Sequence, residues 1–224
     1  MRNILCYGDS NTWGYIPGTG ERYAPSVRWT GVVSRVLGDE WCVHEDGMNC
    51  RTTVYDDPGR PWLNGKDGLA IAMISQKPLD LLILSLGTND MKFTDARGAA
   101  LGIRRLAELA KVIQAAPQSS KPFPNGLKIL IISPIHIGLK VSDDPFSLMY
   151  GKYEETLKFK DFFLHAAETV GAGFLDAALY AEPSEADGEH MSPEGHCRLG
   201  LAIAGKIRDM FEYYFPNQLD YTLI

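Results

Sequence analysis

The stretch RNILCYGDSNTWGY, residues 2–15, decides how the chain folds. Its first half is short and apolar on both sides, which predicts a strand over residues 2–8 at the centre of a parallel sheet. Gly8, Asp9 and Ser10 then form an abrupt polar turn where the buried strand should end. Taken alone, Ser10 fits a turn residue, a helix cap or a nucleophile equally well, so the rest of the chain has to decide.

Strand-length apolar runs alternate with segments of helical length beyond this stretch. Further strands are predicted at residues 41–47, 79–87, 127–133 and 171–177, and helices at 29–38, 63–76, 98–116, 149–170 and 192–215. Repeated strand–helix units of this kind form one parallel sheet with helices on both faces. We predict a single domain over residues 1–224, a flavodoxin-like three-layer α/β/α fold with a five-stranded parallel sheet.

The composition is that of an ordinary globular protein with an acidic balance. The chain has 224 residues, 45% of them hydrophobic, and a formal net charge of −6. Because there is no dense Lys/Arg stripe, we expect neither nucleic acid nor a membrane as partner. No His/Cys/Asp set has metal-ligand spacing, so no metal and no cofactor are predicted. Without a leader or an apolar run of about 18 residues, a cytoplasmic protein is expected.

Polar residues follow the predicted strands at the points where ligands bind in such folds. In open α/β sheets, ligands lie beyond the carboxyl ends of the strands. Ser10 follows the first strand, Asn89 the third and His136 the fourth, and the loop after the fifth carries Asp187 and His190. A serine, an amide, a histidine and an aspartate supply a nucleophile, an oxyanion donor, a base and a group that orients the base.

Each of these residues also has a simpler interpretation. A serine after a strand is commonly a turn residue or a cap, Asn89 favours turns, and Asp187 and His190 taken alone would be solvated loop residues. His196 lies in the last predicted helix and has no aspartate three residues before it, so we do not expect it to be the base. The joint pattern and its order along the chain favour acyl-transfer chemistry.

The sequence resembles the SGNH (GDSL) hydrolase superfamily, which is named for conserved sequence blocks. GDSNTWG (8–14), GTND (87–90) and DGEH (187–190) match the first, third and fifth blocks, although Asn11 replaces the usual Leu. EDGMNCRTT (45–53) departs from the second block, which usually has a glycine at the position of its cysteine. Three blocks in the right order, each at the end of a strand, make the resemblance specific.

The resemblance implies a role for each matched residue. The implied triad is Ser10 as nucleophile, His190 as base and Asp187 as the residue that orients the base. The implied oxyanion hole consists of the backbone N–H groups of Ser10 and Cys50 and the side-chain amide of Asn89. Gly47, three residues before Cys50, is the alternative backbone donor. Asp9 would fix the turn after the first strand.

A closer similarity is to the bacterial arylesterase and acyltransferase branch, through RYAPSVRWTGVV (22–33) and LNGKDGL (63–69). That branch is typically cytoplasmic and forms homo-oligomers that narrow the entrance to the active site. It implies that Tyr15 lines the acyl channel, where the branch often has Trp. Independently of the resemblance, the tail 216–224 ends in apolar residues, so it would cover a neighbouring subunit, pack on its own chain or fray. Substrate contacts are expected from Asp9, Asn11, Trp13, Tyr15 and His136.

We therefore expect a serine esterase that hydrolyses or transacylates small acyl or aryl esters. Four aromatic residues are expected near the entrance to the site: Trp13, Tyr15, Trp29 and Trp62. They suit an aryl or short acyl ester but would stack on a sugar as well, so a carbohydrate O-acetylesterase stays open, as does a thioesterase or lysophospholipase. A flavodoxin-like binding module is the alternative outside enzymes. A phosphatase with an aspartate nucleophile would need a second Asp where Asn11 stands, and no G-x-S-x-G elbow or phosphate-binding glycine loop occurs.

Overall fold

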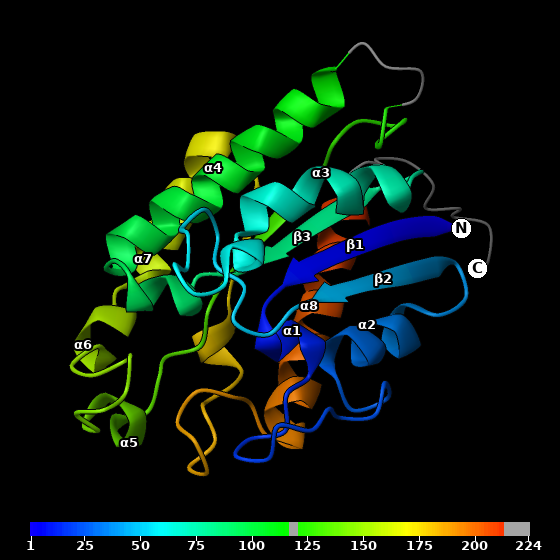
Figure 1. Cartoon of the computed structure of the whole chain (residues 1–224). Coiled ribbons are helices and arrows are strands. Elements are labelled where there is room, and N and C mark those ends of the chain that lie inside the picture. Colours follow the sequence, from blue (N-terminus) through cyan, green and yellow to red (C-terminus); the bar gives the residue numbers. More distant parts are fainter. Residues whose placement is uncertain (117–120, 213–224) are drawn as a thin grey trace.

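The computed structural model describes residues 1–116 and 121–212 (Figure 1). Its strands are β1 (Arg2–Gly8), β2 (Trp41–Gly47), β3 (Leu81–Ser85), β4 (Ile129–Ser133) and β5 (Gly173–Asp176). They form one sheet in the order β2-β1-β3-β4-β5, and every neighbouring pair is parallel. The predicted α/β fold with a five-stranded parallel sheet is confirmed.

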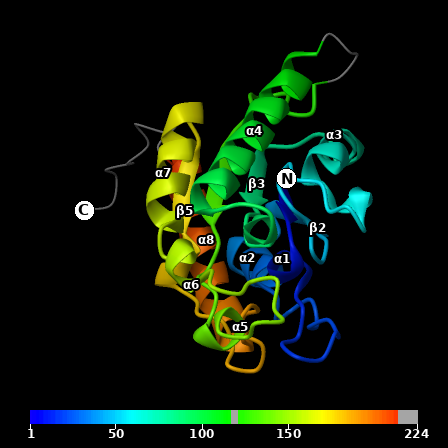
Figure 2. The ribbon, with the colours of Figure 1, turned by 60° about the vertical axis from the view of Figure 1, so that its left-hand side comes forward.

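Helices cover both faces of the sheet. The α-helices are α1 (Ser10–Trp13), α2 (Trp29–Leu37), α3 (Gly65–Ser75), α4 (Ala96–Ala115), α5 (Leu139–Ser142), α6 (Tyr153–Thr156), α7 (Phe159–Val170) and α8 (Pro193–Glu212). Single turns of 3₁₀ helix are η1 (Pro61–Leu63), η2 (Asn89–Lys92) and η3 (Ala177–Leu179). In Figures 1 and 2, α3, α4 and α7 lie on one side of the sheet and α2 and α8 on the other.

The central strand β1 explains the apolar run with which the sequence begins. Leu5 and Tyr7 point into a core shared with α3, α4 and α7, whereas Ile4 and Cys6 point into a second core shared with α2 and α8. All four side chains are at most 1% exposed. A strand buried on both faces needs apolar residues at successive positions, which is why alternation is absent here.

The predicted helix over residues 149–170 is wrong in its first half. The chain turns at Gly151, whose φ of 70° lies in the left-handed region that a continuing helix excludes. A single helical turn, α6, follows and ends at Thr156, whose hydroxyl donates to the carbonyl of Tyr153 at 2.7 Å. That local bond competes with helix continuation. The long helix α7 therefore begins only at Phe159.

The strand order places a crevice beside β1. The chain leaves β1 for β2 on one side and returns to β3 on the other, so the direction of winding reverses between β1 and β3. In this strand order, ligands bind at that reversal, outside the carboxyl ends of the strands. Two short helical turns begin there, α1 after β1 and η2 after β3, and they carry Ser10 and Asn89.

Two sequence predictions fall on residues 117–120 and 213–224. The first is the surface loop, which is described only from residue 121 onward, and the second is the C-terminal tail with the last three residues of the predicted final helix. Both segments lie outside the described residues. Among the helices that the structure describes, none is long and apolar enough to cross a membrane.

Candidate active site

Ser10 is the first residue of α1, and Asp9 before it caps this helix. The Asp9 carboxylate accepts from the backbone N–H of Asn11 at 3.0 Å, and Gly14 ends the helix with φ 88°. Asp9 is only 3% exposed. Burial raises its pKa to about 6, although the Asn11 N–H partly offsets the effect. Asp9 therefore fixes the turn that presents Ser10, and its contact with substrate stays a prediction.

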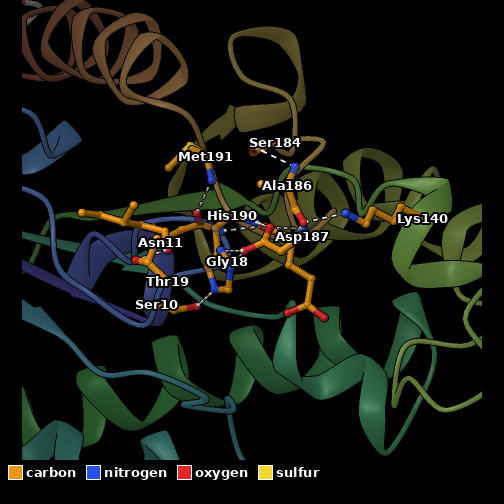
Figure 3. Close-up of polar contacts among 12 residues, drawn as sticks. Ser10, Asn11, Gly18, Thr19, Lys140, Ser184, Ala186, Asp187, His190 and Met191 are labelled. Carbon is orange, nitrogen blue, oxygen red and sulfur yellow. Dashed lines mark hydrogen bonds and ion pairs between the residues drawn. The ribbon is translucent and has the colours of Figure 1, made fainter.

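The structure brings Ser10, His190 and Asp187 into one line (Figure 3). The Oγ atom of Ser10 lies 2.9 Å from Nε2 of His190, and Nδ1 of the same ring lies 2.8 Å from Oδ2 of Asp187. Both separations are hydrogen-bond distances. A histidine held in this way can accept the hydroxyl proton of a serine while its other nitrogen donates to a carboxylate.

The Asp187 carboxylate is held in its charged form by its neighbours. Its Oδ1 accepts from the backbone N–H groups of Glu189 and His190, both at 3.0 Å, and its Oδ2 accepts from Gly18 N–H at 3.1 Å. Burial raises the Asp187 pKa, but the bonds from the His190 ring and these N–H groups outweigh burial and lower it to about 2. Near neutral pH, Asp187 is therefore a carboxylate that keeps the ring proton on Nδ1.

A tight turn allows Asp187 to reach a histidine only three residues away. Gly188 has φ 74°, as the sequence led us to expect, and its N–H donates to the Ser184 carbonyl at 2.8 Å. The Ser184 N–H in turn donates to the carbonyl of His190 at 2.7 Å. The part of the loop before Asp187 is called the outer limb. There, Nζ of Lys140 donates to the carbonyls of residues 185 and 186 at 3.1 and 2.7 Å.

His196 lies apart from this line. It is completely buried in α8, and its Nδ1 accepts from the backbone N–H of Trp29 at 3.3 Å. Burial lowers its pKa to about 4, and electrostatic interactions with His190 and Arg28 act in the same direction. His196 is thus a neutral core residue. The expectation that Trp29 lies near the entrance is wrong, because Trp29 is 1% exposed and packs between the sheet and α8.

Asn89 lies in η2, and both ends of its side-chain amide are held. Its Nδ2 donates to the Arg51 carbonyl at 3.2 Å, and its Oδ1 accepts from Nζ of Lys92 at 2.7 Å. A side-chain amide has two N–H donors, so one remains for a ligand. The sequence interpretation missed Lys92, although its spacing of three residues from Asn89 on a helical turn was an available signal.

Arg51 is a second residue that the sequence interpretation missed. It is buried, and its guanidinium donates to the carbonyls of Gly8 at 2.9 Å and Asp46 at 2.6 Å. A further bond of 2.7 Å joins it to the Asp46 carboxylate. Arg51 thereby ties together the ends of β1 and β2 and fixes the carbonyl that holds Asn89. Nothing local in the sequence identifies these partners.

The last residue of GTND has a structural role. Asp90 is fully buried and accepts from both the backbone N–H and the hydroxyl of Thr53. Burial raises its pKa to about 7; the Thr53 bonds lower the pKa and the charge of Asp9 raises it further. Asp90 anchors the segment after β2 against the segment after β3, and both segments carry predicted oxyanion donors.

Cys50 adopts a backbone conformation that explains why the family usually has glycine there. Its φ is 64°, and it is the one non-glycine residue with positive φ in the described chain. Within residues 1–116 and 121–212, neither its N–H nor that of Ser10 donates to another protein group. Position 47 requires glycine for packing, because a Cβ there would approach the backbone N of Trp13 to 2.2 Å, and which of the Cys50 and Gly47 N–H groups meets an oxyanion stays a prediction. Gly47 lets α1 pack on β2.

We expect Cys50→Gly to preserve activity and to raise the free energy of unfolding by up to about 1 kcal/mol. A left-handed non-glycine residue costs about 1–2 kcal/mol, of which the greater unfolded-state freedom of glycine cancels part. Cys50→Val should lower the free energy of unfolding, whereas Cys42→Val, on extended β2, should be tolerated. Urea unfolding measures all three variants, and a clear loss of stability in Cys50→Gly would contradict the argument.

The predicted substrate-contact residues surround His190 to different degrees. The Tyr15 ring stacks on the His190 imidazole, with centroids 4.2 Å apart and planes at 28°. Trp13 lies beside Tyr15 at 6.3 Å, and the side chain of Asn11 bonds to the backbone near His190. His136 is half-buried after β4, and no hydrogen bond within the described chain joins its side chain to the Ser10–His190–Asp187 line. Their contacts with substrate stay predictions.

The arrangement contains the parts that acyl transfer requires. A serine hydroxyl is bonded to an imidazole, and an ionised carboxylate holds the other ring nitrogen. The segments that follow β1, β2 and β3 carry three N–H donors that have no partner among the described residues. Among the described residues, no group of three or more His, Cys, Asp or Glu side chains could hold a metal ion. These are the residue types from which a nucleophile, a base and oxyanion donors are built.

Comparison with known proteins agrees with this chemistry. Residues 6–198 match the GDSL-like lipase/acylhydrolase family. The carbohydrate acetylesterase Est24 from Sinorhizobium meliloti is 32% identical, with 94% of this chain and 100% of that chain covered and a TM-score of 0.85. The M. smegmatis aryl esterase is 33% identical, with 93% and 99% covered and a TM-score of 0.83. No curated protein sequence matched. The chain belongs to the GDSL-like lipase/acylhydrolase family, the SGNH hydrolases, and is a carboxylic ester hydrolase.

Proposed function

We propose that this chain is a serine esterase that hydrolyses small acyl or aryl esters through a covalent acyl-enzyme. The observation that carries the proposal is the unbroken line from Ser10 through His190 to Asp187, with separations of 2.9 and 2.8 Å. The ionised state of Asp187, whose pKa is lowered to about 2, supports its role as the group that orients the base.

The proposed reaction moves one proton between Ser10, His190 and the leaving alcohol. Nε2 of His190 takes the proton of Ser10 as Oγ attacks the ester carbonyl, and Asp187 stabilises the imidazolium that forms. When the tetrahedral intermediate collapses, the C–O bond to the alcohol breaks and His190 returns the proton to the leaving oxygen. Water, or another alcohol, then attacks the acyl-enzyme with His190 again as base, which restores Ser10.

We propose that three N–H groups stabilise the oxyanion of the tetrahedral intermediate. These are the backbone N–H groups of Ser10 and Cys50 and the Asn89 amide proton that does not bond to Arg51. Each has no partner within residues 1–116 and 121–212, and in comparable sites one such donor contributes about 10²–10³ in kcat. Lys92 supports this arrangement, since its bond to Oδ1 fixes which end of the Asn89 amide faces the substrate.

Short acyl groups and aryl alcohols suit the surroundings of the base. Tyr15 stacks on His190 and Trp13 lies beside Tyr15, which places aromatic surface next to the base. A carbohydrate O-acetylesterase is the second candidate, because the similar protein Est24 is named as one and Trp62, 67% exposed, could stack on a sugar. Acyl transfer to an alcohol, a homo-oligomer and a cytoplasmic location are proposed from the branch resemblance alone.

A panel of p-nitrophenyl esters tests the substrate class. We expect metal-free protein to hydrolyse the acetate with a kcat/KM at least about tenfold above that for the octanoate, since pocket contacts discriminate by about tenfold or more per methylene. EDTA should leave the rate unchanged. If the acyl-enzyme also reacts with alcohols, adding an alcohol should yield a new ester beside the free acid. Acetylated xylose, run beside the panel, distinguishes the second candidate. Turnover of no ester, or loss with EDTA, would contradict the proposal.

A further inference from the structure

Asn11 joins the segment of the nucleophile to the segment of the base. It follows Ser10 directly in α1, and its Oδ1 accepts from the backbone N–H of Met191 at 3.1 Å (Figure 3). Its Nδ2 donates to the carbonyl of Glu189 at 3.3 Å. These two backbone groups belong to the residues on either side of His190, so one short side chain bonds to the chain before and after the base.

We infer that Asn11 is a positioning residue that sets the His190 imidazole at bonding distance from Ser10. The inference rests on the proposed function, in which the proton moves between these two side chains. An error of about 1 Å in such a geometry can cost about 10²-fold in rate. The amide of Asn11 is planar and short, so its two bonds leave the residues around His190 little freedom relative to α1.

The other contacts of this loop do not perform the same task. Lys140 bonds to the outer limb at residues 185 and 186, and Gly138 N–H donates to the Gly188 carbonyl at 2.7 Å. Apart from the reacting pair Ser10 and His190, no other hydrogen bond in the described chain joins α1 to residues 187–191. The bond of the reacting pair changes during catalysis, whereas the bonds of Asn11 persist.

The residue type matters at this position. A carbonyl and an N–H on the loop require one donor and one acceptor, which a side-chain amide supplies and the family's usual leucine does not. Both heteroatoms of Asn11 are engaged by the loop. Asn11, which stands where the family usually has leucine, therefore helps to position His190.

The test compares Asn11→Leu with Lys140→Met in the full chain, using p-nitrophenyl acetate. Both variants remove two hydrogen bonds to the same loop, but only the first removes those beside His190. Asn11→Leu should lower kcat by about 10- to 100-fold with KM within about twofold, and Lys140→Met should leave both within about twofold. If Asn11→Leu does not fold, Asn11→Ala replaces it. An equal loss in Lys140→Met would overturn the inference, because general loosening of the loop would then explain it.

Two further measurements separate this inference from the proposed function. The imidazole N–H signal of His190 in the ¹⁵N–¹H spectrum should shift or broaden in Asn11→Leu while that of His196 stays unchanged; an unchanged His190 signal would overturn the inference. So would a raised KM with unchanged kcat, which would assign Asn11 to substrate binding. If Ser10→Ala, assayed in parallel, keeps its turnover, the proposed function fails; if only Asn11→Leu is unaffected, the inference alone fails.

Discussion

Ser10→Ala should lower kcat for p-nitrophenyl acetate by about 10⁴–10⁶-fold, because the variant has no atom to form the acyl-enzyme. Losses of this size accompany removal of the nucleophile in enzymes with such a triad, and the turnover that remains comes from the oxyanion donors and from binding. The substitution leaves the proposed oxyanion donors in place, since the proposed contribution of Ser10 is its backbone N–H. Steady-state kinetics with a burst-phase measurement checks both the loss and its cause.

The variant should fold normally, which makes the result interpretable. Ser10 is 9% exposed, and its hydroxyl has one hydrogen-bond partner, His190. Losing that bond should change the free energy of unfolding by about 1 kcal/mol at most. Ser34→Ala on α2 is the matched control and should keep full activity. Activity retained in Ser10→Ala with a normal melting temperature would remove Ser10 from the mechanism.

The sheet and the strand ends were predictable because buried strands appear in the sequence as short apolar runs. β1 and β2 have the predicted bounds, and β3, β4 and β5 lie within theirs. The three central strands β1, β3 and β4 are the most buried, and strands buried on both faces need continuous apolar residues. The carboxyl ends of parallel strands share one edge, so Ser10 and Asn89 were expected near each other before any contact was known. Burial says less about where a helix breaks, and Gly151 was missed for that reason.

The supporting contacts of the site could not be predicted, because they join residues far apart in the chain. Asn11 bonds to residues about 180 positions away, and Arg51 fixes Asn89 through a carbonyl 38 positions away. The residues next to Asn11 and Arg51 in the sequence do not indicate which distant residues these two side chains will contact. Trp29 illustrates the reverse error, since an aromatic residue near a motif can belong to the core as readily as to an entrance.

Burial and hydrogen bonding shift the pKa values of three carboxyl groups near the site, Asp9, Asp90 and Asp187, in opposite directions. Asp9 and Asp90 are buried with few donors, and burial raises their pKa values to about 6 and 7. Asp187 accepts from three backbone N–H groups and a histidine ring, and its pKa falls to about 2. Only Asp187 stays charged from about pH 4 upward, which is what a residue that stabilises an imidazolium must do.

His190→Ala should lower kcat by about 10⁴–10⁶-fold, whereas His196→Asn should keep most of the rate. His190 is the proposed base, and its removal takes away the imidazole that lies 2.9 Å from the Ser10 hydroxyl. His196 is neutral at pH 7 because its pKa is lowered to about 4, and an asparagine oxygen can still accept from Trp29 N–H. The two histidines lie six residues apart, so the pair separates base chemistry from the effect of losing any nearby imidazole.

The pH dependence provides an independent check on the same assignment. In the wild type, kcat/KM should fall on the acid side of its pH profile once the base of the reaction is protonated, because a protonated imidazole cannot accept the proton of Ser10. Asp187, with its pKa near 2, adds nothing to this limb above about pH 4. The limb should therefore persist unchanged in His196→Asn. If the acid-side fall of kcat/KM disappeared in His196→Asn, or if His190→Ala kept near-normal turnover, His190 would not be the base. The proposed Ser10–His190–Asp187 triad would then be wrong.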